Sequence, residues 1–144
     1  MDHEITAFLS KLRTLKTNRG ALAMLRRGNI DGISVLADVL PRDWKQKWFL
    51  LVAECWADNT TDGDKLALVC KNLKINENRF RILLFSDREE LPQRMKSILR
   101  MISQKGFGVN WFLLLRDLIF WGENVQREWA MDFWATKTGE EKHE

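Results

Sequence analysis

The sequence contains no tyrosine, only two prolines and two cysteines, and both of its histidines, His3 and His143, stand near its ends. Proline interrupts helices and is common in turns, so its scarcity favours helices joined by short loops. Without a CxxC pair or an internal histidine, the usual zinc ligand sets are excluded. The chain also lacks GxSxG and phosphate-loop patterns. We therefore predict a protein that is not an enzyme and that has no metal site, no cofactor and no catalytic residues.

Long hydrophobic segments are missing as well. No apolar run approaches the roughly 20 residues that a membrane span needs, and the sequence after Met1 does not resemble a basic signal peptide. Cys55 and Cys70 each stand in an apolar helical pattern, which predicts buried free thiols. We expect a cytoplasmic protein in a reducing compartment, with no membrane partner.

What the chain does have is a large apolar fraction, 45% hydrophobic residues with seven Trp and eight Phe. Four of the tryptophans lie between Val109 and Trp134, where an apolar helix is followed, after Gly122, by an amphipathic one. Trp111 and Trp121 stand in or beside the most apolar helix, so we interpret them as core residues and not as base-stacking groups. The first helix is expected at residues 3–15.

The periodicity along the whole chain predicts an all-α protein of about eight or nine helices in two packed sub-bundles. The polar stretch from Asp58 to Asp64 marks the boundary. We predict an N-terminal sub-bundle at residues 1–58, a polar linker at 59–64, a C-terminal sub-bundle at 65–137 and a flexible tail at 138–144.

Local signals place several helix ends. Asn18 and Asn76 are predicted N-caps, and Asp87 with Glu90 fits a capping box. Residues 28–32, Gly-Asn-Ile-Asp-Gly, are predicted to form a loop before a short helix at 33–40.

Two carboxylate features could carry chemistry but favour simpler interpretations. Asp117 interrupts the apolar helix, and we interpret it as a salt-bridge partner of Arg116 or of a neighbouring helix. Arg116 itself is expected to favour Asp117 or Asp132 over a phosphate. The three aspartates between Asp58 and Asp64 lack the distal Glu and the spacing of a calcium-binding loop.

Residues 65–85 have the outline of a helix-turn-helix. The candidate recognition segment, Phe80 to Phe85, is too apolar to present polar groups to base edges.

Basic residues are scattered over predicted exposed positions, and the formal net charge is +3. A track of Arg and Lys without base-reading groups binds the phosphate backbone without reading sequence. From the residues alone, such a phosphate-binding module and a plain protein-interaction domain stay open as alternatives.

Several short motifs then appear in a fixed order, together with the arginine-bearing Leu25-Arg26-Arg27. They are Ile75-Asn76-Glu77-Asn78-Arg79-Phe80, Ser86-Asp87-Arg88, Val109-Asn110-Trp111, Leu115-Arg116-Asp117-Leu118, Trp121-Gly122 and Asp132-Phe133-Trp134. This ordered set resembles the CasB family, the small subunit of the type I-E CRISPR Cascade complex.

The resemblance implies a non-catalytic helical subunit that helps to stabilise target DNA and the displaced strand of the R-loop. The implied partners are the backbone and large subunits of Cascade, CRISPR RNA and target DNA, and a second copy of the chain. Motif position and helical phasing together give the candidate nucleic-acid-binding residues, which are Arg19, Arg26, Arg27, Lys74, Arg79, Arg88, Lys96 and Arg100. The alternative is a helical adaptor or a helix-turn-helix regulator.

Overall fold

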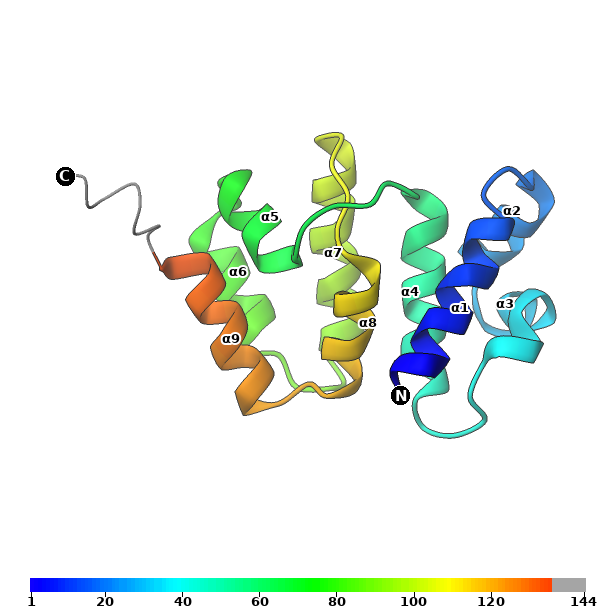
Figure 1. Cartoon of the computed structure of the whole chain (residues 1–144). Helices are drawn as coiled ribbons and strands as arrows, with labels where there is room; N and C mark the ends of the chain where they lie inside the picture. Colours follow the sequence, from blue (N-terminus) through cyan, green and yellow to red (C-terminus); the bar gives the residue numbers. More distant parts are fainter. Residues whose placement is uncertain (136–144) are drawn as a thin grey trace.

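The computed structural model describes residues 1–135, and within that range it is all-α, as the periodicity predicts (Figure 1). Nine α-helices and one 3-10 helix follow one another along this part of the chain. Their bounds are α1 Asp2–Thr14, α2 Arg19–Arg27, α3 Asn29–Leu36, η1 Ala37–Val39, α4 Gln46–Asp58, α5 Leu66–Asn72, α6 Glu77–Leu84, α7 Leu91–Gln104, α8 Trp111–Ile119 and α9 Glu123–Trp134. The predicted flexible tail at 138–144 lies outside the described residues.

The helices form two neighbouring groups, α1–α4 and α5–α9, that meet where α1 and α4 pack against α7 and α8 (Figure 1). One hydrophobic core runs through both groups, from Ile5 in α1 to Trp129 in α9. Trp48 and Phe49 of α4 are completely buried in it. The two groups therefore share a core, and the division into sub-bundles at residues 58 and 65 stays a prediction.

The predicted caps position the helices that carry the candidate site. The Asn18 side chain accepts a hydrogen bond from the backbone N–H of Ala21 at 3.0 Å, and the Asn76 side chain accepts one from Arg79 at 3.1 Å. Asp87 and Glu90 bond reciprocally, since each carboxylate accepts from the other's backbone N–H at 2.9 and 3.4 Å. These bonds confirm the predicted capping residues.

The loop predicted at residues 28–32 is wrong, because α3 begins at Asn29. Gly28 and Asn29 make the turn, since their φ values of +67° and +49° both lie in the left-handed region. The N–H of Gly28 donates to carbonyls at the end of α2. Asn29, Ile30 and Asp31 are then free to form the first turn of α3, so the short helix starts earlier than predicted.

The polar connector at residues 59–64 is fixed along its length to the segment that joins α7 to α8. Four hydrogen bonds of 2.7–3.0 Å join the two segments. The donor and acceptor pairs are Asn59 Nδ2 to Phe107 O, Gly63 N to Val109 O, Asn110 N to Asp64 O, and Trp111 Nε1 to Thr61 O. We call this pair of segments the strap.

Two glycines allow the close approach within the strap. A Cβ at Gly63 would lie 2.3 Å from the Gly108 carbonyl oxygen, and one at Gly108 would lie 1.9 Å from that of Thr61. Any side chain at either position would collide with backbone.

The aromatic stretch at 109–134 is scaffold, as predicted. Trp111 is 3% exposed and Trp121 is 6% exposed. The Trp121 ring meets Trp129 edge to face, and its Nε1 donates to the Ser86 carbonyl at 3.1 Å. Both tryptophans are thus core residues.

Candidate nucleic-acid interface

Three of the predicted cations gather beside a groove between α4 and α7, which we call the α4–α7 groove. Lys96 and Arg100 stand one turn apart on α7 and line it, and Arg26 reaches its rim from the end of α2. The groove has a volume of about 320 Å³. These residues are far apart in sequence, and the packing of α2 and α7 on α4 brings them together.

Two carboxylates on α4 partly neutralise this cluster. Lys96 Nζ lies 3.0 Å from Glu54 Oε2, and Arg26 Nε lies 3.2 Å from Asp58 Oδ1. Arg26 also donates to the carbonyl of Ala57 at 2.9 Å. Arg100 forms no ion pair with any residue in 1–135, so the groove keeps one unpaired cation. The Arg26–Asp58 pair is exposed and the Lys96–Glu54 pair is half-buried. Ion pairs that solvent reaches are weak, and phosphate can compete for them.

The one thiol of the groove is chemically quiet. Burial, together with the neighbouring Glu54 carboxylate, raises the pKa of Cys55 to about 12. The thiol is therefore protonated at neutral pH, and it cannot serve as a nucleophile there.

A second groove lies on the other side of α7, against α6, and we call it the α6–α7 groove. It has a volume of about 460 Å³, and Arg79 of α6 lines it with Arg94 and Ser97 of α7. Successive residues of a helix are about 100° apart around its axis, so the α7 residues that line one groove lie on the opposite side of the helix from those that line the other. The exposed strip of α7, which includes Arg100, runs between these two sides. Helix α7 is therefore a ridge between two grooves, and it lies behind α8 in Figure 1.

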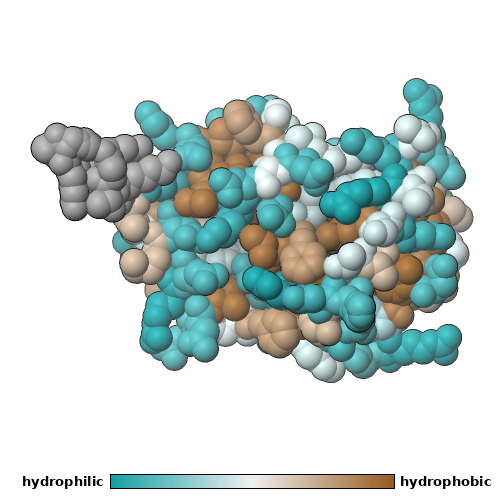
Figure 2. Space-filling model, viewed as in Figure 1, coloured by the Kyte–Doolittle hydropathy of each residue, from teal (hydrophilic) through white to brown (hydrophobic). Residues whose placement is uncertain are grey.

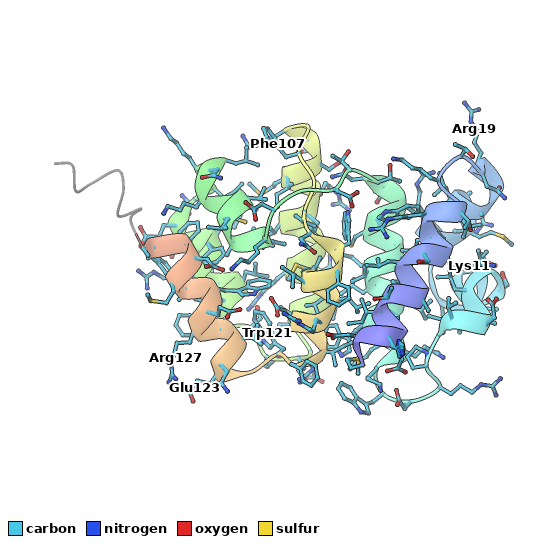
Figure 3. All side chains as sticks on the ribbon, viewed as in Figure 1. Lys11, Arg19, Phe107, Trp121, Glu123 and Arg127 are labelled. Carbon is cyan, nitrogen blue, oxygen red and sulfur yellow. The ribbon has the colours of Figure 1, made fainter. Side chains whose placement is uncertain are left out.

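Three other predicted residues lie outside both grooves. Arg19 points away from the molecule at the outer end of α2 (Figure 3), and Lys74 is exposed in the turn after α5 with a φ of +56°. Arg27 Nε lies 2.6 Å from Asp31 Oδ2, one turn further on. A contact between these residues and nucleic acid stays a prediction.

Arg88 has an intramolecular role that the sequence did not reveal. Its guanidinium donates to the carbonyls of Leu118, Ile119 and Trp121 at 3.3, 3.1 and 2.8 Å, and so it caps the end of α8. It also lies 5.7 Å from the ring centre of Trp44. These donors are occupied within the chain, so a contact between Arg88 and nucleic acid stays a prediction.

The carboxylates predicted as partners of Arg116 have other partners. Asp117 accepts a hydrogen bond from Trp129 Nε1 at 2.7 Å, and burial raises the pKa of its carboxyl. Asp132 lies 3.5 Å from Lys65 Nζ. The Arg116 guanidinium instead lies over the ring of Phe112. The predicted ion pair was wrong because consecutive side chains of a helix point about 100° apart, so Asp117 faces Trp129 of α9 while Arg116 faces Phe112.

The sequence interpretation missed the residues that complete the α6–α7 groove. Arg94 bonds to Glu90 and to Ser86 Oγ, and with Ser97 it faces α6. The sequence signal for Arg94 was its place four residues after Glu90, the spacing at which opposite charges pair along a helix. The amide of Asn78 gives no signal by itself, because its position in a groove depends on how α6 packs on α7.

Within residues 1–135, no three His, Cys, Asp or Glu side chains are close enough together to hold a metal ion. No helix in this part of the chain has the length and apolar character needed to cross a membrane.

The arrangement of these helices matches that of known CRISPR-associated proteins. The chain is 27% identical to M. ruber CasB, with a TM-score of 0.77, and the match covers 97% of each chain. It is 25% identical to CasB from Thermus thermophilus, with a TM-score of 0.76, and covers 92% of this chain and 98% of that one. A structure described as a CRISPR RNA-guided surveillance complex contains a chain of the same fold, 20% identical, with a TM-score of 0.77 and coverage of 92% and 91%.

The family model of the CRISPR-associated protein Cse2 matches residues 21–134. The chain therefore belongs to the Cse2 family, which confirms the resemblance to CasB proteins. No curated protein sequence matches it significantly.

Proposed function

We propose that this chain is a non-catalytic subunit of a CRISPR RNA-guided surveillance complex of the Cascade type, and that it holds nucleic-acid backbone without reading sequence. Membership of the Cse2 family supports the place in such a complex. The observation that carries the binding proposal is the convergence of Arg26, Lys96 and Arg100 on the α4–α7 groove.

The chemistry of this groove suits phosphate. Arg and Lys donate charge-assisted hydrogen bonds to phosphate oxygens, and such contacts carry no sequence information. The carboxylates of Glu54 and Asp58 offset part of the positive charge, so a single copy of the chain binds weakly. Attachment to a complex that already holds the nucleic acid compensates for weak binding by raising the local concentration.

In an RNA-guided complex the guide reads the sequence by base pairing, and R-loop formation is nearly balanced in free energy. A few backbone contacts are then enough to shift the balance. We infer that the α7 ridge contributes such contacts to target DNA or to the displaced strand, and that Arg79, Arg19, Arg27 and Lys74 extend the basic track.

The remaining surface offers contacts for protein subunits. Figure 2 shows apolar patches among the hydrophilic side chains on the face turned toward the viewer. Trp44, Phe85 and Phe120 are 58%, 73% and 57% exposed. Exposed aromatic side chains are typical anchors at protein interfaces, so we infer that they meet neighbouring subunits or a second copy of the chain.

The helix-turn-helix alternative has less support. Phe80 of α6 is fully buried and stacks on Phe133 with ring centres 4.0 Å apart. The helix that would enter the major groove therefore carries part of the core.

The binding proposal is tested with the full chain by gel shifts on unrelated DNA sequences over a salt series. We expect equal, weak binding to all sequences and a steep loss of affinity as salt rises. Arg100→Ala should weaken binding to every sequence alike and lower the salt slope by about 1.

Arg127→Ala is the control, because Arg127 lies on the outer end of α9 and pairs only with Glu123 among the described residues (Figure 3). Tight binding to one sequence, or an Arg100→Ala variant that binds as well as the Arg127→Ala variant, would contradict the proposal.

A further inference from the structure

The α6–α7 groove differs from the α4–α7 groove in its chemistry. Its floor is aliphatic, since Leu83 and Ile98 are 1% and 2% exposed beneath it and Ile82 is 49% exposed at its edge. Polar groups stand around that floor, among them the side chains of Asn78 and Ser97. A surface that needed only to hold phosphate would not require an apolar floor.

The two arginines that line the groove differ in whether their charge is paired. Arg94 is held by both oxygens of Glu90 at 3.3 Å and by Ser86 Oγ at 3.1 Å, so its charge is balanced and its position is fixed. Arg79 is exposed at the mouth of the groove and forms no ion pair within residues 1–135. One free cation thus stands beside an apolar floor.

The amide of Asn78 completes the set. It makes no side-chain hydrogen bond to any residue in the described part of the chain, whereas Asn76 next to it caps α6. A planar amide offers one donor and one acceptor side by side, which is the pattern that pairs with a base edge, best with that of adenine. The groove volume of about 460 Å³ is within the range of sites that bind small organic ligands.

We propose that the α6–α7 groove is a subsite for one unpaired nucleobase of a single strand, with the base against Ile82 and the aliphatic floor, the Asn78 amide on its edge and Arg79 on the adjoining phosphate. The base must be unpaired, because a paired base has its faces and its Watson–Crick edge covered in the stack. This inference rests on the proposed backbone binding, to which it adds one contact that depends on the base.

The test compares the full chain on two single-stranded oligonucleotides of equal length, one of adenine nucleotides and one of abasic sites, by fluorescence anisotropy at low salt. Both carry the same phosphates, so backbone binding alone gives equal affinities. We expect the adenine strand to bind about fivefold or more tightly than the abasic strand.

Asn78→Ala should weaken binding to the adenine strand about three- to tenfold and leave the affinity for the abasic strand unchanged. The matched control is Asn124→Ala, because Asn124 follows Glu123 at the start of α9 as Asn78 follows Glu77 at the start of α6. Arg79→Gln should weaken binding to both strands by the same factor. Thermal melts of both asparagine variants check that α6 remains folded.

The outcomes separate the two proposals. If the wild-type chain binds both strands equally, or if Asn78→Ala loses no more affinity than Asn124→Ala, the base subsite is overturned and backbone binding stands. If the wild-type chain binds neither strand at low salt, both proposals fail.

Discussion

Glu54 limits how strongly the α4–α7 groove attracts phosphate. Its carboxylate lies 3.0 Å from Lys96 Nζ, in the position that a phosphate oxygen would take. The same groove contains Asp58, which pairs with Arg26. In the binding mode that we propose, the affinity of the isolated chain for nucleic acid is thus the difference between the attraction of three cations and the competition from two carboxylates.

Glu54→Gln removes one competitor and keeps the shape of the side chain. We expect the affinity for any DNA sequence to rise about two- to fivefold at low salt, since an ion pair that solvent still reaches, as this half-buried one is, contributes up to about 1 kcal/mol. The gain should disappear at high salt. Gel shifts over a salt series measure it.

Glu123→Gln is the control, because Glu123 pairs with Arg127 at the outer end of α9, far from the groove (Figure 3). An affinity that stays the same or falls in Glu54→Gln would show that Lys96 does not meet phosphate.

At the scale of elements, the ends of the helices depend on single side chains. Arg88 is the clearest case, because it belongs to the loop after α6 but satisfies three carbonyls at the end of α8. Carbonyls at a helix end have no partner within the helix, and here a guanidinium from about thirty residues away supplies it.

Arg88→Met keeps the aliphatic part of the side chain and removes the donors. We expect the free energy of unfolding to fall by about 2 kcal/mol, the usual effect of losing hydrogen bonds that involve a charged group. Denaturant titration measures this change. Arg127→Met, which loses only an exposed ion pair, should lower it by less than about 1 kcal/mol. Equal losses in the two variants would argue against the capping role.

The sequence predicts what is local in these elements. Asn18 and Asn76 were recognisable as caps because a cap bonds to a backbone N–H three residues ahead. The predicted loop at 28–32 failed because turn-forming residues also suit the first turn of a helix, and two left-handed residues, Gly28 and Asn29, were enough for the reversal. The role of Arg88 was invisible, since its acceptors are backbone atoms and leave no pattern.

At the scale of the whole molecule, the candidate site arises from helix packing. The sequence marked Arg26, Lys96 and Arg100 as exposed, but it could not place them around one groove, because they come from three separate stretches of chain. Nor could it show that Glu54 competes for Lys96, because that pair depends on how α7 crosses α4. The fold class follows from periodicity alone, whereas the grooves do not.

The strap should be the least tolerant part of the surface. Gly108→Ala places a Cβ 1.9 Å from the Thr61 carbonyl oxygen, so the backbone must move and bonds of the strap must break. We expect a loss of about 3 kcal/mol in the free energy of unfolding, at the upper end for overpacking. Denaturant titration measures this loss. A smaller dependence of the unfolding free energy on denaturant concentration would report a loss of cooperativity between the two helix groups.

Gly20→Ala is the comparison, because a Cβ there meets Asn18 Oδ1 at an ordinary 3.6 Å within α2. That variant should be as stable as the parent chain or up to about 1 kcal/mol more stable. A Gly108→Ala variant of undiminished stability would mean that the strap is not closed in solution.

The strap also restricts the geometry of any strand that binds beside α7. A polar connector between two groups of helices commonly serves as a hinge, but this one is bonded to its neighbour at four points. The two grooves beside α7 therefore keep a constant separation. In the binding mode that we propose, the molecule acts as a fixed template, and a nucleic-acid strand that occupies both grooves must bend to their spacing.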